Sequence, residues 1–115
     1  MSNCWNTNIH EMNRTIYEEA LDVWGEDSQI EQLIEECSEI ILALQKLKRN
    51  RRFNLTDERE QRIEDVLEEI ADVKIMIRQI ELIFSPESVA KYEQIKLDRL
   101  RKRLDDYAFR KTNNK

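Results

Sequence analysis

Only one glycine and one proline occur in this chain of 115 residues. Both residue types supply backbone conformations that tight turns need, so the chain can form few such turns. A strand-rich sandwich or barrel is therefore not expected, and neither is a glycine-rich phosphate-binding loop. Charged residues make up 37% of the chain, and charged helix formers combined with Leu and Ile favour a helical bundle. We predict an all-α protein with a single domain over residues 1–115.

Apolar residues that recur at three- and four-residue steps predict four helices. The expected ranges are 8–24, 28–49, 57–84 and 86–109, with residues 111–115 frayed. Gly25 suits the left-handed exit from the first helix, and Asp27 or Ser28 is expected to cap the second. Ser85 is expected to cap the fourth helix, with Pro86 at its first position. These helices are expected to form a four-helix antiparallel bundle, completed by oligomerisation.

Two apolar stripes are expected to form the core. The stripe of 28–49 consists of Ile30, Leu33, Ile34, Cys37, Ile40, Ile41, Leu44 and Leu47, and that of 57–84 consists of Ile63, Val66, Leu67, Ile70, Val73, Ile77 and Phe84. Cys37 is interpreted as a small buried hydrophobic residue. Other apolar residues exceed what one unit can bury, so a second subunit is expected to cover some of them. They are Leu42, Met76, Ile80, Ile83 and Ile95.

Charge and cysteine content narrow the class of protein. Residues 1–90 hold 10 basic and 20 acidic side chains, a net charge of −10, which argues against general binding to nucleic acids. Residues 91–115 carry a net charge of +5. The chain contains no run of 18 apolar residues, so no membrane span is predicted. Two cysteines are too few for a disulfide framework, so a reduced, cytoplasmic protein is expected.

An acidic motif occurs twice in the sequence. Residues 33–42 resemble residues 66–75, and each segment holds a glutamate pair followed three residues later by a third acid. The two motifs are Glu35-Glu36-x-x-Glu39 and Glu68-Glu69-x-x-Asp72.

Helical geometry places an acid pair from each motif on matching flanks of the two apolar stripes. At about 100° per residue, Glu36 and Glu39 lie to one side of Cys37. Antiparallel packing would bring these two acids together with Glu69 and Asp72. Four adjacent carboxylates repel unless protonated or neutralised, and their all-oxygen chemistry favours Mg²⁺ or Mn²⁺. The alternative is an ordinary solvated surface, because glutamate pairs are common on exposed helix flanks.

The pattern Glu35-Glu36-x-x-Glu39 followed by Glu69-x-x-Asp72 resembles the EExxE…ExxD signature of MazG-like nucleoside triphosphate pyrophosphohydrolases. These enzymes belong to the all-α NTP pyrophosphatase superfamily. The lead-in, Trp24-Gly25-x-x-x-Gln29, is similar to a segment that often precedes this signature, and the resemblance covers residues 24–84. The spacer between the two motifs, residues 40–68, is at the long end for this family.

The resemblance implies a Mg²⁺-dependent enzyme that splits NTP or dNTP into the monophosphate and pyrophosphate, working as a homodimer or homotetramer. Carried over by position, the metal ligands would be Glu36, Glu39, Glu69 and Asp72. Glu35, or a ligand carboxylate such as Glu36, would orient the attacking water.

Substrate contacts are assigned from chemistry. Basic side chains should hold the leaving pyrophosphate, and Lys48, Arg51 and Lys96 are candidates. Trp24 and Gln29 are candidates for contacts to the base. Core packing is the alternative for Trp24, and solvent exposure is the alternative for Gln29.

Two other functional interpretations remain. A non-catalytic helical adaptor or regulator would act through the basic C-terminal helix, although Asp98, Asp105 and Asp106 interleave with the cations there and also fit a solvated helix face. A di-iron bundle is disfavoured because such sites use Glu-x-x-His pairs, and the single histidine, His10, lies far from the acids.

Overall fold

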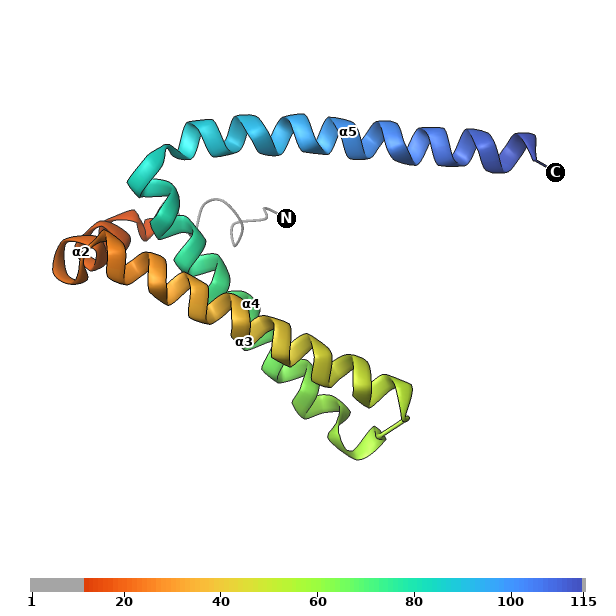
Figure 1. The fold of residues 1–115 in the computed structure, drawn as a ribbon, viewed down its shortest axis with the longest axis horizontal. Coiled ribbons are helices and arrows are strands. Elements are labelled where there is room, and N and C mark those ends of the chain that lie inside the picture. The colour runs from red at the N-terminus through yellow and green to blue at the C-terminus, as the bar shows by residue number, and fades with distance from the viewer. Residues whose placement is uncertain (1–11, 115) are drawn as a thin grey trace. The chain divides into compact units, whose positions relative to one another are not determined.

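The computed structural model describes residues 12–114. Its elements are α2 (Arg14–Trp24), α3 (Glu26–Arg52), the 3₁₀ turn η1 (Thr56–Glu58), α4 (Arg59–Phe84) and α5 (Pro86–Asn113) (Figure 1). No strand occurs within this described range. Over residues 12–114 the prediction of an all-α fold with four helices is therefore confirmed, whereas the expected start of the first helix at residue 8 lies outside the described residues.

Helix boundaries depend on a few local residues. Gly25 has a φ of 87°, and its N–H donates to the Leu21 carbonyl at 2.9 Å, as expected for a left-handed helix exit. Helix α3 begins directly after Gly25, so Asp27 and Ser28 lie inside its first turn and the expected side-chain cap was wrong. Ser85 caps α5 as predicted, because its Oγ accepts from the Ser88 N–H at 3.1 Å. Helix α5 also continues four residues beyond the predicted end, to Asn113.

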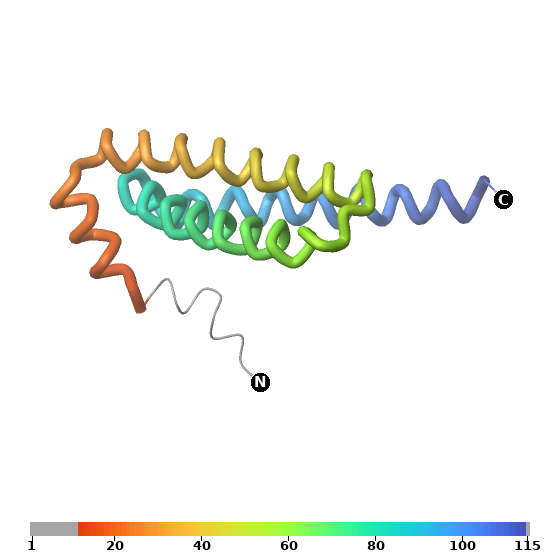
Figure 2. The backbone as a smooth tube through the Cα atoms, turned by 90° about the horizontal axis from the view of Figure 1, so that it is seen from below, coloured from red at the N-terminus to blue at the C-terminus, as the bar shows by residue number. Residues whose placement is uncertain are grey.

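The chain divides into two units at this capped break, residues 1–84 and residues 85–115. In the first unit, α3 and α4 run antiparallel and side by side, and α2 contacts both near the start of α3 (Figures 1 and 2). The second unit is the single helix α5. Whether the two units together form one domain stays a prediction. Among the helices of residues 12–114, none combines the length and apolar composition needed to span a bilayer.

The surface between α3 and α4, here called the seam, follows a regular three- and four-residue repeat. Its members, all buried or half-buried, are Gln29, Leu33, Glu36, Ile40, Ala43, Leu47 and Asn50 on α3, and Arg62, Val66, Glu69, Val73, Met76, Ile80 and Ile83 on α4. Such spacing is typical of paired helices that pack side chain against side chain. The seam is unusually polar, since it includes Gln29, Glu36 and Asn50 on α3.

Much of the predicted core stripe lies outside the seam and is exposed in this chain. Apart from Phe84 at the end of α4, the exposed members are Ile34, Cys37, Ile41 and Leu44 on α3 and Ile63, Leu67, Ile70 and Ile77 on α4, and these eight are here called the apolar face. Each directly follows a seam residue, so each is rotated from the seam by about 100°. Because the helices are antiparallel, these rotations place all eight residues on the same side of the helix pair.

Two predictions about the core are corrected by this arrangement. Cys37 is exposed rather than buried, because the seam is centred on its neighbour Glu36. Met76, Ile80 and Ile83 belong to the five apolar residues of which a second subunit was expected to cover some, and all three lie in the seam and are buried or half-buried within one chain. The residues left exposed are those of the apolar face instead.

Asn50 closes the connection between α3 and α4. Its side chain is only 2% exposed, its Nδ2 donates to the Leu55 carbonyl at 2.6 Å, and its Oδ1 accepts from Arg59 Nε at 3.0 Å. Asn54, in the same connection, has a φ of 53°, a left-handed conformation that asparagine tolerates. This turn fixes the register between the two helices and therefore decides which acids meet across the seam.

Candidate metal centre

Three carboxylates converge at the middle of the seam. Glu36 on α3 and Glu69 and Asp72 on α4 each offer an oxygen, and these oxygens all lie within 4.8 Å of one another. Glu36 and Glu69 occupy seam positions, whereas Asp72 lies one helical turn beyond Glu69 on its exposed flank. The structure thus brings together three of the four acids that the sequence nominated as metal ligands.

Two oxygens in this cluster are buried without a partner. Neither Glu36 Oε2 nor Glu69 Oε2 has a hydrogen-bond partner among the described residues. The other oxygen of Glu36 accepts from Gln32 Nε2 at 2.9 Å. A buried carboxylate oxygen without a partner destabilises the folded protein, because it has lost its contacts with water. A cation that contacted both oxygens would offset this desolvation penalty.

The electrostatics at Glu69 also favour a bound cation. Burial raises the pKa of Glu69 above its ordinary value of 4.5, and the charges of Glu39, Asp72 and Glu36 raise it further. A hydrogen bond with the Glu39 carboxyl also raises this pKa. The fourth nominated acid, Glu39, therefore lies next to Glu69 even though it is outside the group of three.

The donor set fits a hard divalent cation. Each of the three converging groups offers a carboxylate oxygen, which is a ligand type that Mg²⁺ and Mn²⁺ prefer in proteins. Exposed acidic groups are also common in proteins that bind no metal. What distinguishes this cluster from such a surface is the pair of buried, unpartnered oxygens on Glu36 and Glu69.

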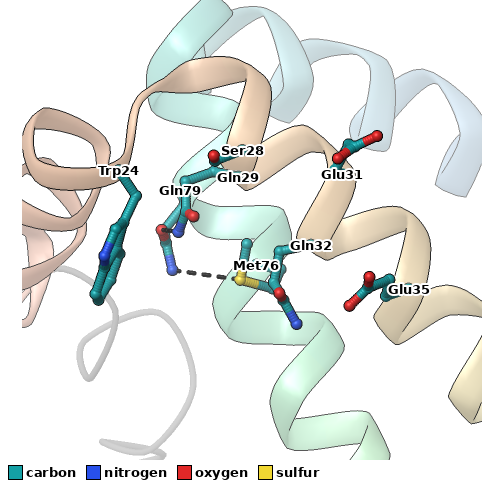
Figure 3. Close-up of a pocket in the computed structure, with 8 residues that line it drawn as sticks. All are labelled: Trp24, Ser28, Gln29, Glu31, Gln32, Glu35, Met76 and Gln79. Carbon is teal, nitrogen blue, oxygen red and sulfur yellow. Dashed lines mark hydrogen bonds between the residues drawn. The ribbon is translucent and has the colours of Figure 1, made fainter.

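A pocket of about 530 Å³ lies beside the acids, towards the start of α3 (Figure 3). Its floor is an amide pair in which Gln29 Nε2 donates to Gln79 Oε1 at 2.7 Å, and Gln79 Nε2 in turn points to Met76 Sδ at 3.6 Å. We call this cavity the amide pocket, and Trp24 forms one of its walls. The full lining is Trp24, Ser28, Gln29, Glu31, Gln32, Glu35, Met76 and Gln79.

A second, smaller pocket of about 170 Å³ lies on the other side of the acids. It is lined by Glu39, Leu42, Ala43, Lys46, Asp65, Glu68 and Glu69 and is here called the lysine pocket. Both pockets open on one continuous face of α3, since six of the α3 residues that line them follow a single three- and four-residue series. That series is Ser28, Gln32, Glu35, Glu39, Leu42 and Lys46. We call this side of the helix pair the acidic face. It lies opposite the apolar face.

The other residues that the sequence nominated for catalysis or substrate binding lie in different parts of the structure. Glu35 lines the amide pocket and is not a member of the acid trio. Lys48 lines a different pocket, shared with Arg49, Arg52 and Phe53, and Arg51 is exposed one residue beyond the seam position Asn50. Both Lys48 and Arg51 follow seam residues, so both lie on the flank of α3 that carries the apolar face. Lys96 belongs to α5, in the second unit.

Two residues of these pockets were missed by sequence reasoning. Lys46 continues the series that contains Glu35 and Glu39, so its helical phase could have identified it. Gln79 could not be identified in this way, because its role depends on a contact with Gln29 fifty residues away. Trp24 is 65% exposed, so the alternative of plain core packing does not describe it, and Gln29 is buried rather than solvent-exposed.

Comparisons with known proteins gave no match. No protein-family model matches the chain, and none of the curated proteins or solved structures is significantly similar to it.

Proposed function

We propose that this chain is a Mg²⁺-dependent nucleoside triphosphate pyrophosphohydrolase of the MazG-like type, acting in the cytoplasm on NTP or dNTP. The observation that carries the proposal is the convergence of Glu36, Glu69 and Asp72 at the seam, with two buried oxygens that have no partner among the described residues. The acidic motif supplies the resemblance, and the adjoining pockets supply room for a nucleotide.

Each acid has a distinct role in this proposal. Glu36, Glu69 and Asp72 hold the metal ion, with Glu39 beside Glu69 as the fourth carboxylate. A bound Mg²⁺, or Mn²⁺ in its place, cancels the repulsion between these acids, attracts the phosphate oxygens and lowers the pKa of a bound water. Glu35, on the same face and closer to the amide pocket, orients the water that attacks the α-phosphorus.

The amide pocket is assigned to the base. The indole of Trp24 offers a flat surface for stacking, which is tolerant of base identity. Gln29 and Gln79 together offer hydrogen-bond acceptors and donors, and every base edge carries groups of both kinds. The pocket's 530 Å³ lies within the size range of small-molecule sites.

Turnover assays test this proposal directly. The protein is incubated with each NTP and dNTP in the presence of Mg²⁺, and the release of pyrophosphate and monophosphate is measured. Glu36→Gln and Asp72→Asn should abolish turnover while circular dichroism retains the helical signal. Glu64→Gln, which changes an exposed acid of α4 outside both pockets, is the matched control and should behave as the wild type. Absence of turnover with every nucleotide would count against the proposal.

We further propose that two copies of the chain associate through the apolar face. Seven aliphatic side chains on this face are each between about one third and two thirds exposed, and large exposed apolar patches mark interaction sites. A second copy offers two parallel stripes of the same width, so the face is self-complementary about a two-fold axis. The metal centre lies on the opposite side and stays open to substrate.

One observation favours a second function, that of an adaptor acting through α5. This helix carries an exposed stripe of Leu97, Leu100, Leu104 and Tyr107, flanked by cations such as Lys96 and Arg103. Such a stripe fits the groove of a helical, acidic partner. Calorimetry separates the two functions, because an adaptor without a metal centre would bind neither Mg²⁺ nor Mn²⁺ in the presence or absence of nucleotide.

A further inference from the structure

We propose that Lys46 holds the pyrophosphate group of the substrate, which sets the direction of the nucleotide along the acidic face. The base lies towards Trp24 and the polyphosphate points towards the C-terminal end of α3. This inference rests on the proposed function and extends it to a residue outside the acidic motifs.

The position of Lys46 carries the argument. It is the only cationic residue that lines the lysine pocket, and that pocket also contains Glu39 and Glu69. The amide pocket lies on the other side of the same acids, on the same face of α3. A nucleoside triphosphate is a linear molecule with a base at one end and the terminal phosphates at the other. Two pockets that flank the metal centre, one amide-lined and one lysine-lined, match these two ends.

The side chain of Lys46 is also long enough to reach towards the proposed metal centre. It lies seven residues after Glu39, a rise of about 10 Å along the helix. Side chains of a helix lean towards its N-terminus, so the Lys46 side chain extends back towards Glu39. A lysine is long enough to place its ammonium group roughly one turn closer to the acids than its own Cα. The β- and γ-phosphates extend about this far from an α-phosphate at the metal centre.

The lining of the lysine pocket holds four acids beside Lys46, and part of their negative charge is offset. Asp65 is paired with Arg62 at 3.7 Å and accepts from Gln61 Nε2 at 2.8 Å, so its charge is partly compensated. Glu39 and Glu69 adjoin the proposed metal centre, where a divalent cation would offset part of their charge. Glu68 is the remaining acid among the lining residues. Lys46 itself forms no ion pair with any residue of the described range.

Calorimetric titration of the full chain with magnesium pyrophosphate tests the assignment without requiring turnover. Lys46→Gln should weaken pyrophosphate binding about tenfold or more, because a charge-assisted hydrogen bond to phosphate is lost. Lys46→Arg should restore most of the affinity. Lys74→Gln, which removes a lysine from α4 on the opposite side of the pair, is the matched control. Binding of Mg²⁺ alone should be unchanged in all three variants.

A second titration, with a nucleoside monophosphate, distinguishes contact with pyrophosphate from a general loss of structure. The monophosphate occupies the base end, so Lys46→Gln should leave its affinity unchanged. Equal weakening of both ligands, or unchanged pyrophosphate binding in Lys46→Gln, would overturn the assignment. So would weakening by Lys48→Gln in its place. If the wild type turns over nucleotide but Lys46→Gln binds pyrophosphate as well as the wild type does, only the role of Lys46 is refuted. If the wild type shows no turnover, the result counts against the proposed function.

Discussion

Glu36 and Glu69 face each other across the seam, and each has a buried Oε2 without a partner among the described residues. Two such groups in one contact destabilise the helix pair unless a proton or a cation lies between them. The helix pair therefore loses stability at the place where we propose that it binds a cation. This relationship makes metal binding and folding stability measurable through one another.

The variant Glu69→Gln should separate metal binding from folding stability. The amide removes a negative charge from the cluster, so we expect the metal-free protein to have a higher melting temperature at pH 7 than the wild type. The same change removes a proposed metal ligand, so Mg²⁺ affinity should fall by more than about tenfold and Mg²⁺ should no longer raise the melting temperature. Differential scanning calorimetry with and without Mg²⁺ measures both effects. A variant that kept the full Mg²⁺-dependent stabilisation would show that the ion binds elsewhere.

The raised pKa of Glu69 predicts how stability depends on pH. Its folded pKa exceeds the ordinary 4.5, so the folded state binds the proton more tightly than the unfolded state does. The contribution to stability is complete below pH 4.5 and is lost as the pH rises through the folded pKa. Subtracting the unfolding free energies of Glu69→Gln from those of the wild type across pH 4 to 8, without metal, isolates this contribution. A difference that did not vary with pH would contradict the prediction.

Gln29 and Gln79, the amide pair of the amide pocket, should show strong energetic coupling. Gln79→Leu leaves the buried Gln29 Nε2 without its acceptor, so the free energy of unfolding should fall by about 1–3 kcal/mol. Gln29→Leu combined with Gln79→Leu removes both partners and should recover much of this loss. Chemical denaturation of the two single variants and the double variant measures the coupling. Additive losses would mean that the two amides act independently.

Self-association should depend on Ile41 and not on the adjacent Leu42. Ile41 lies on the apolar face and Leu42 on the acidic face, although both are more than half exposed. Ile41→Glu should convert the protein to a monomer, and Leu42→Glu should leave the oligomer intact. Light scattering reports the mass, and the reaction of Cys37 with a thiol reagent, in a Cys4→Ser background, reports whether the face is covered. A wild type that is monomeric at all concentrations would refute the proposed interface.

Asn50 should be essential to the connection between α3 and α4. Asn50→Ala removes two hydrogen bonds at a position that is 2% exposed, leaving the Leu55 carbonyl and Arg59 Nε without this partner. We expect a loss of about 2–3 kcal/mol in the free energy of unfolding. Thermal unfolding measures this loss, and Gln45→Ala, at an exposed position on α3, is a suitable control. A change below about 0.5 kcal/mol would show that the connection does not depend on this side chain.

The sequence by itself determined the helices and the flanks on which the acids lie. Helical periodicity, the Ser85-Pro86 boundary and the left-handed Gly25 are properties of neighbouring residues, so they can be identified without any tertiary contact. The phase of Glu36, Glu39, Glu69 and Asp72 is local in the same sense, and the convergence of the acids followed once α3 and α4 packed antiparallel.

Only the tertiary structure decided which side of each helix forms the seam. Hydrophobicity alone favoured a contact centred on Cys37, but the helices meet about one residue away, at Glu36, and a rotation of about 100° exchanges the covered and exposed sides. Polar seam residues such as Gln29 and Asn50 are compatible with burial because Gln79, Leu55 and Arg59 supply their hydrogen bonds. Those partners come from distant positions or from the turn, and no local pattern contains them. Part of the predicted apolar stripe was consequently left exposed as the apolar face, about 100° from the seam.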